Sequence, residues 1–317
     1  MSVYTPVDQD SLNAFLAHYQ VGALVAYEGI SAGIENTNYF VDTDGGRWVL
    51  TLFECLQANE LDYYLELMAW LAEKGIPTAA PQRNDQGDFL GTLCGKPATL
   101  VKRLHGSSVS KPDERHCRAI GEALANLHLA GQDFPRKRLD ERGADWWKQT
   151  VARVRPHLDT EQQALADEEL RFQGLYARSN LPQGTIHADL FHDNALFSDH
   201  RLSGLIDFYY ACYDALLYDI AVTVNDWCSL DSGELDGPRV RVLLAAYHAI
   251  RPLSALEKGA WPVALRAAAM RFWLSRLTDQ HFPRDGEITH IKDPGVFQRI
   301  LQQRIAHTDS LRQHWPE

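Results

Sequence analysis

The stretch of sequence that decides the fold is residues 184–208, GTIHADLFHDNALFSDHRLSGLIDF. Two apolar runs within it, ALF and GLI, flank a polar turn, which predicts a β-hairpin. In such a hairpin the two outer ends meet, so we expect Asn194 and Asp207 to lie side by side. Their amide and carboxylate oxygens are ligands that suit Mg²⁺. Asp189 precedes Asn194 by five residues and is expected to project into the same space.

A free carboxylate beside a metal-binding pair is the arrangement that phosphoryl transfer needs, because the carboxylate orients the acceptor hydroxyl and takes its proton. The spacing His187-x-Asp189-x₄-Asn, followed by Ile-Asp-Phe at residues 206–208, matches the protein-kinase motifs. Ala188 replaces the usual Arg and Tyr209 the usual Gly. Caps and turns also use Asp and Asn, but they do not explain three matched positions together. We therefore predict Asp189 as the catalytic base and His187 as a residue that supports its loop.

A zinc site is the alternative for the same loop, with His187, Asp189 and His192 as ligands. The sequence disfavours it, since neither a Cys pair nor a His-Glu-x-x-His motif accompanies these residues. The sequence also lacks the two common phosphate-binding loops, G-x-x-x-x-G-K-[ST] and G-x-G-x-x-G.

The remainder of the chain indicates two parts of different character. In residues 1–102, β-rich runs flank Asp44-Gly45-Gly46 and Gly95-Lys96-Pro97, which predicts two hairpins with one helix between them. From residue 103 the apolar spacing is mainly helical. Helices are expected from Asp113 to Gly131 and over residues 145–177, 215–227, 239–250 and 260–278.

This organisation predicts an α+β, protein-kinase-like two-lobe fold. Residues 1–102 form a small antiparallel sheet lobe with one helix, which binds the nucleotide. Residues 103–317 form a larger, mainly helical lobe for catalysis and the acceptor substrate. A ligand is expected in the cleft between the lobes.

Composition limits the partners. The chain has 317 residues, with 31 Lys and Arg against 42 Asp and Glu, a formal net charge of −11. Such an acidic balance disfavours nucleic acids and anionic membranes as partners. Neither a signal peptide nor a membrane-spanning helix is indicated, and the five scattered cysteines are typical of reduced thiols. We expect a cytoplasmic protein that acts on small molecules, and the sequence does not indicate its oligomeric state.

These motifs resemble those of the aminoglycoside phosphotransferase and choline kinase branch, and within it the bacterial homoserine kinases. The matching segments lie in both predicted lobes, at residues 29–40, 48–54, 187–194 and 271–277. The resemblance implies transfer of the γ-phosphate of ATP to the hydroxyl of L-homoserine, a step of threonine biosynthesis. It also implies ATP and Mg²⁺ as cofactors. A choline- or aminoglycoside-type kinase and a non-catalytic, nucleotide-binding pseudokinase are the alternatives.

The resemblance places the nucleotide phosphates at the first hairpin turn, near residues 31–38. The expected contacts there are Ser31, Gly33, Asn36, Thr37 and Asn38. An ordinary polar loop is the alternative. The chain departs from the kinase pattern nearby, because Thr51 and Tyr64 stand where a strand Lys and a helix Glu are expected. Lys102 is one candidate for the missing cation.

A small zwitterionic acceptor needs a cation for its carboxylate and an acidic group for its ammonium. Arg276, beside Trp273, is the candidate for the carboxylate, and Asp226 and Asp214 are the candidates for the ammonium. Asp219 resembles a position that braces the catalytic loop in this branch, so we assign it to loop support together with His187.

Overall fold

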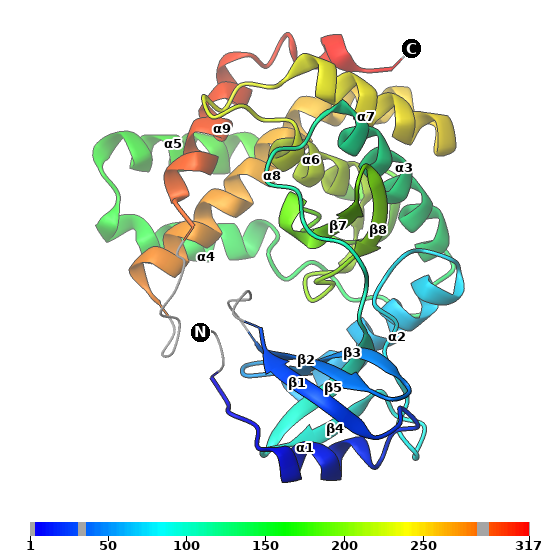
Figure 1. Cartoon of the computed structure of the whole chain (residues 1–317). Helices are drawn as coiled ribbons and strands as arrows, with labels where there is room; N and C mark the ends of the chain where they lie inside the picture. The colour runs from blue at the N-terminus through cyan, green and yellow to red at the C-terminus, as the bar shows by residue number, and fades with distance from the viewer. Residues whose placement is uncertain (1–3, 31–35, 284–291, 317) are drawn as a thin grey trace. The chain divides into compact units, whose positions relative to one another are not determined.

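The computed structural model describes residues 4–30, 36–283 and 292–316 (Figure 1). The described chain divides into two compact units. Unit 1 contains residues 4–30, 36–105 and 204–209, and unit 2 contains residues 106–203, 210–283 and 292–316. A short piece of the motif stretch, with Asp207 in it, therefore belongs to unit 1, while Asp189 and Asn194 belong to unit 2.

Unit 1 is built on a five-stranded antiparallel sheet in the order β1-β2-β3-β5-β4. Its strands are β1 (Leu24–Gly29), β2 (Thr37–Thr43), β3 (Gly46–Leu52), β4 (Leu90–Leu93) and β5 (Lys96–Lys102). Asp44 and Gly45 form the two-residue turn between β2 and β3, since Thr43 pairs with Gly46. Both predicted hairpins, β2–β3 and β4–β5, are confirmed. Side chains along β2 alternate between buried and half-buried positions, beginning with the buried Thr37. One face of the sheet therefore lies against the core.

Two helices accompany this sheet rather than the single one expected. The predicted helix is α2 (Ala58–Glu73), and Gly75 follows it with a left-handed φ of 84°. The additional helix, α1 (Gln9–Leu16), has only eight residues, too few for the apolar spacing to indicate it. It forms because Asp8 caps its first turn and because its apolar side chains join the core of the sheet.

Unit 2 is mainly helical, as predicted. Its helices are α3 (Glu114–Gly131), α4 (Ala144–Val154), α5 (Thr160–Gln173), α6 (Leu216–Trp227), α7 (Gly237–Ile250), α8 (Ala255–His281) and α9 (Pro294–Ala306). α3 packs against α7, and α8 packs against α6 and α9 (Figure 1). The predicted helical region 145–177 is divided into α4 and α5, because Pro156 interrupts the first helix and Asp159 caps the second. The sequence analysis did not indicate α9.

Short strands carry the motif stretch. β6 (Gln183–Ile186) pairs with β9 (Cys212–Ala215) in antiparallel orientation. β7 (Ala195–Ser198) and β8 (Arg201–Leu205) form the predicted hairpin, which turns at Asp199 and His200. The hairpin positions Asn194 directly before β7 and Asp207 two residues after β8.

No helix in the described ranges combines the length and the apolar content that crossing a membrane requires.

The contact between α3 and α7 provides a test of packing in unit 2. A Cβ atom on Gly121 of α3 would lie 2.3 Å from the backbone oxygen of Leu243 in α7. We expect Gly121→Ala to lower the free energy of unfolding by about 1–3 kcal/mol, because the helices must move apart. Urea denaturation would measure this loss.

Gly259→Ala is the matched control, because a Cβ atom at this position in α8 meets no atom within 4 Å. It should raise stability by about 0.5–1 kcal/mol, since Ala restricts the unfolded chain more than Gly does. Equal effects of the two substitutions would contradict the close packing of α3 on α7.

Candidate active site

The predicted catalytic loop joins β6 to β7 in unit 2. The amide nitrogen of Asn194 donates to the backbone oxygen of Asp189 at 2.8 Å and to its Oδ2 at 3.2 Å. The structure therefore brings the predicted base and one predicted metal ligand into direct contact. Because the amide nitrogen faces Asp189, the amide oxygen of Asn194 points away from it.

Asp219 of α6 holds the start of this loop. Its Oδ2 accepts the backbone N–H of His187 at 2.7 Å, and its Oδ1 accepts that of Ala188 at 2.8 Å. Ala188 has a left-handed φ of 62°, which costs an L-residue roughly 1–2 kcal/mol. His187 and Asp219 are both fully buried. The two hydrogen bonds to the carboxylate offset the backbone strain immediately before Asp189.

A further support residue, His128 of α3, was missed by the sequence analysis. Its Nε2 lies 3.0 Å from Oδ2 of Asp219, and its Nδ1 lies 2.7 Å from the hydroxyl of Tyr247 in α7. Burial lowers the pKa of His128, which favours the neutral ring. Because a carboxylate only accepts, the ring donates from Nε2 and accepts the tyrosine hydroxyl at Nδ1. The sequence shows His128 only as a histidine on the apolar face of a predicted helix, a pattern that does not by itself indicate this role.

The charge of Asp219 is stabilised by these donors. Burial by itself would raise the pKa of its carboxyl, but the hydrogen bond from His128 and the N–H of His187 bring it below its usual value. Asp219 is therefore a buried carboxylate at neutral pH, with two oxygens that accept from two adjacent backbone groups and from one ring.

Two arginines of α8 lie in the neighbourhood of Asp189. The Nη1 of Arg271 is 3.8 Å from Oδ1 of Asp189, and the Arg271 side chain is almost entirely buried. Burial lowers the pKa of Arg276, and the carboxylates of Asp226 and Asp189 are among those that act against this shift. The Nη1 of Arg276 donates to the backbone oxygen of Asp293 at 3.0 Å, and its guanidinium lies 4.5 Å from the centre of the Phe297 ring.

Asp226 of α6 contacts the same loop. Its Oδ2 accepts the backbone N–H of His192 at 2.7 Å and lies 2.8 Å from Nδ1 of the same histidine. The hydrogen bond to Asp226 raises the pKa of His192, and burial opposes the shift. In the described structure Asp226 therefore holds the segment after Asp189, and its contact with an ammonium group stays a prediction.

A second missed group lies around Tyr210. Arg142 donates from Nη2 to the hydroxyl of Tyr210 at 3.1 Å and from Nη1 to the hydroxyl of Ser275 at 3.2 Å. The guanidinium of Arg271 lies over the Tyr210 ring, 5.0 Å from its centre. These contacts link Arg142, before α4, to Ser275 and Arg271 of α8. Nothing in the local sequence around Arg142 indicates this role.

In unit 1, the segment that carries Asp207 is fixed by its own neighbours. Leu205 donates its N–H to the backbone oxygen of Pro77 at 2.7 Å. Tyr209 packs edge-on against Phe53, with ring centres 5.1 Å apart, and against Tyr64, at 5.9 Å. Asp207 itself has a left-handed φ of 63°. Tyr64, which stands where the kinase pattern expects the helix Glu, thus belongs to an aromatic cluster with Phe53 and Tyr209.

The position of the missing strand lysine is filled by an uncharged contact. The hydroxyl of Thr51, on β3, donates to Oδ1 of Asn38 at 2.7 Å. Thr51 is buried, as is Thr37. The structure therefore accommodates the departure from the kinase pattern with hydrogen bonds inside the sheet.

Of the expected phosphate contacts, Ser31 and Gly33 lie outside the described residues. Thr37 donates its hydroxyl to Oε1 of Glu54 at 2.6 Å. Glu54 also pairs with Lys96 at 2.6 Å between Oε2 and Nζ. The hydroxyl of Thr37 is thus engaged within unit 1, and Asn38 likewise donates its amide to the backbone oxygen of Asn36 at 3.2 Å.

The residues predicted to hold Mg²⁺ have suitable chemistry, namely one amide oxygen and one carboxylate. Since Asn194 and Asp207 belong to different units, their side-by-side arrangement stays a prediction. The zinc alternative at the loop gains no support. Among the described residues, His187, Asp189 and His192 do not gather as a group of metal ligands.

Comparison with known proteins identifies the class. Residues 26–253 match the model of the phosphotransferase enzyme family, so the chain belongs to this family. It is 51% identical over 315 residues to a homoserine kinase of Methylobacillus flagellatus, an alignment that covers 99% of both chains. It is 48% identical over 312 residues to a homoserine kinase of Polaromonas naphthalenivorans, covering 97% of this chain and 99% of that one. The resemblance to the bacterial homoserine kinases of this family is confirmed.

Solved structures agree on the fold. A spectinomycin phosphotransferase in complex with ADP and spectinomycin superposes with a TM-score of 0.71 at 10% identity, covering 98% of this chain and 100% of that one. A choline kinase from Cryptosporidium parvum gives 0.63 at 15% identity, covering 90% and 91%. The predicted protein-kinase-like fold, with an antiparallel sheet followed by a larger helical part, is confirmed.

The Asp219 contacts can be tested by Asp219→Asn. The substitution keeps the shape of the side chain but turns one acceptor into a donor, which then faces a backbone N–H or His128. We expect the free energy of unfolding to fall by about 1–3 kcal/mol in urea denaturation. Asp85→Asn is the control, because Asp85 is exposed and pairs only at the surface with His18. Its change in the free energy of unfolding should stay within about 0.5 kcal/mol. A similar loss of stability in both variants would contradict the role of Asp219 in holding the loop.

Proposed function

We propose that this chain is a homoserine kinase, which transfers the γ-phosphate of ATP to the hydroxyl of L-homoserine and gives O-phospho-L-homoserine for threonine biosynthesis. The observation that carries this proposal is the 45–51% identity, over nearly the whole chain, to proteins that bear this name. ATP and L-homoserine are its small-molecule partners. Because both belong to central biosynthesis, we place the enzyme in the cytoplasm.

Asp189 is the base in this proposal. Its Oδ2 is held by the amide of Asn194 and its Oδ1 faces Arg271, so the carboxylate is fixed in one orientation. A fixed carboxylate aligns the acceptor hydroxyl and accepts its proton as the oxygen attacks the phosphorus. The hydrogen bonds of Asp219 to the preceding residues keep the loop in this form.

Asn194 and Asp207 would hold the magnesium ion. When bound, the ion neutralises the phosphate charge of the nucleotide. The nucleotide would depend strongly on this ion, because the chain carries a net charge of −11 and has no lysine at the usual strand position.

Unit 2 offers both charges that a zwitterionic acceptor requires. Arg276 is the proposed partner of its carboxylate. On the same helix Arg271 lies over the ring of Tyr210, whose hydroxyl accepts from Arg142. Asp226 is the proposed partner of its ammonium. Its Oδ2 already accepts from His192, so the ammonium would share this carboxylate with the loop.

The nucleotide is assigned to the lobe of residues 1–102 and the acceptor to residues 103–317. Since the side chains of Thr37 and Asn38 are engaged with Glu54 and Thr51, we assign their phosphate contacts to backbone N–H groups. Ser31, Gly33 and Asn36 complete the proposed phosphate loop.

A coupled assay of ADP release tests the acceptor. The chain with Mg²⁺ and ATP should form ADP with L-homoserine and not with choline or an aminoglycoside. Identification of the product by ³¹P NMR would place the new phosphate on the side-chain oxygen. Faster turnover with choline or an aminoglycoside would reassign the acceptor. ADP formation with none of the alcohols would favour a nucleotide-binding pseudokinase.

The base assignment is tested by Asp189→Asn. We expect kcat to fall by roughly 10²–10⁴-fold, because the amide cannot accept the proton. Binding of Mg²⁺ and ATP, followed by thermal shift, should persist. Asp193→Asn is the control on the same loop, since the half-buried Asp193 pairs with the exposed Lys292. Turnover close to wild type in Asp189→Asn would remove Asp189 from the reaction.

A further inference from the structure

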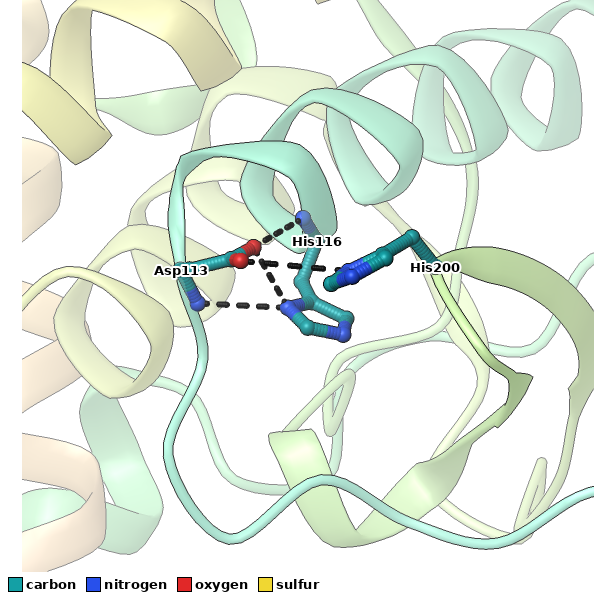
Figure 2. Close-up of side chains that lie close together, drawn as sticks. All are labelled: Asp113, His116 and His200. Atoms are coloured by element: carbon teal, nitrogen blue, oxygen red, sulfur yellow. Dashed lines mark hydrogen bonds and ion pairs between the residues drawn. The ribbon is translucent and has the colours of Figure 1, made fainter.

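Three side chains that the proposed reaction does not use lie together in unit 2. Asp113 and His116 come from the start of α3, and His200 comes from the turn between β7 and β8; Figure 2 shows that they point toward one another. One ligand atom from each residue lies within 4.8 Å of the other two. Among groups of three or more His, Cys, Asp or Glu side chains in the described part of the chain, this one brings its ligand atoms that close together.

The capping of α3 orders two of the three ligands. Oδ1 of Asp113 accepts the backbone N–H groups of Arg115 and His116, at 2.9 and 3.0 Å. In return, the backbone N–H of Asp113 donates to Nδ1 of His116 at 3.2 Å. The carboxylate and the imidazole are therefore fixed side by side by the start of the helix. Oδ2 of Asp113 points toward Nδ1 of His200, 3.8 Å away.

The third ligand is brought in by the β7–β8 hairpin. Phe197 of β7 exchanges two backbone hydrogen bonds with Ser107, at 2.9 and 3.0 Å, which fastens the hairpin beside the segment that leads to α3. The ring of His116 packs edge-on against Phe197, with centres 4.9 Å apart. The ring of His200 lies 4.9 Å from that of His116. His116 is thus packed in place, whereas His200 and Asp113 are half exposed and leave a route for an ion from solvent.

The local charges favour a cation. Nδ1 of His116 lies 2.6 Å from Oδ1 of Asp113 while it also accepts the N–H of Asp113. A neutral ring makes only one of these two hydrogen bonds: with its proton on Nδ1 it donates to Oδ1 of Asp113, and without that proton it accepts from the backbone N–H of Asp113. In the first case a metal ion held by both groups would take the place of the proton, and in the second it would separate two lone pairs.

We propose that Asp113, His116 and His200 bind a zinc ion, with water as the fourth ligand. Two imidazoles and one carboxylate are a donor set that Zn²⁺ takes, whereas Mg²⁺ prefers oxygen ligands alone. Zn–N and Zn–O bonds of about 2.0–2.1 Å require the ligand atoms to approach to roughly 3.3 Å. The exposed turn at His200 allows this contraction without disturbing the helix.

The expected effect of the ion is on stability. It would connect the turn of the β7–β8 hairpin to the start of α3, two segments more than 80 residues apart in sequence. A ligand that binds the folded chain and not the unfolded one raises the melting temperature. The site lies at the turn of the hairpin, whereas Asn194 lies just before its first strand, so the zinc ion belongs to a different position from the proposed magnesium ion.

Cobalt titration provides the test. The chain without a histidine tag is stripped with EDTA, dialysed and titrated with Co²⁺, while visible absorption is recorded. We expect one equivalent to give the intense bands of four-coordinate Co²⁺, and Zn²⁺ to displace it. Excess Zn²⁺ should also raise Tm. In H200A and in D113N the metal affinity should fall at least about tenfold, and the rise in Tm should be lost.

These variants and their controls separate a metal site from a fold defect. D113N keeps the helix cap, because Asn caps helices as well as Asp does, and His200 is half exposed at a turn. H18A removes an exposed histidine of unit 1 that also faces a carboxylate, and it should bind metal like wild type. H157A tests the stacked pair of His157 and His281, whose ring centres are 4.5 Å apart. Absence of binding in wild type, unchanged affinity in H200A and D113N, or a loss confined to H157A would each overturn the proposal.

Discussion

The hydrogen bonds from Asp219 to the backbone of residues 187 and 188 are the interaction on which the candidate site depends. Left-handed backbone at Ala188 turns the chain so that Asp189 leaves the end of β6 instead of continuing the strand. An alanine does not favour this conformation by itself, and only a buried acceptor with two oxygens can satisfy both N–H groups. His128 and Tyr247 extend the same network to α3 and α7, so the orientation of the proposed base is set by helices that never touch substrate in our proposal.

In unit 2, both positively and negatively charged side chains accompany Asp189. Arg271 and Arg276 come from α8, while Asp226 comes from α6 and contacts the loop through His192. A buried arginine is costly unless carboxylates or aromatic rings surround it, and here Tyr210 and Phe272 lie under Arg271. A bound zwitterion would insert one negative and one positive group into this network. The acidic surface of the chain is compatible with such a site because the cations are local and buried.

Much of the fold could be predicted because its signals are local. The turn at Asp44 and Gly45, the cap at Asp113 and the spacing from His187 to Asn194 all lie within a few residues of what they determine. Other features depend on partners far along the chain. α1 forms where its apolar side chains meet the sheet, and His128 acquires its role from Asp219, 91 residues later. Arg142 is likewise meaningful only beside Tyr210 and Ser275. Spacing and composition do not indicate such long-range contacts. The sequence therefore indicated Asp219 and His187 as supports of the catalytic loop but not His128.

In our two proposals, the β7–β8 hairpin serves two cations of different chemistry. Asn194, directly before the hairpin, offers an amide oxygen, which attracts a hard ion that keeps much of its water. His200, at the turn, offers an imidazole nitrogen, which such an ion does not seek. The hairpin is held between these ends by its backbone bridge to Ser107. A magnesium ion that neutralises phosphate must come and go with the nucleotide, whereas an ion bound by fixed nitrogens can stay. In these proposals, donor chemistry therefore separates a transient ion from a resident one along a single short hairpin.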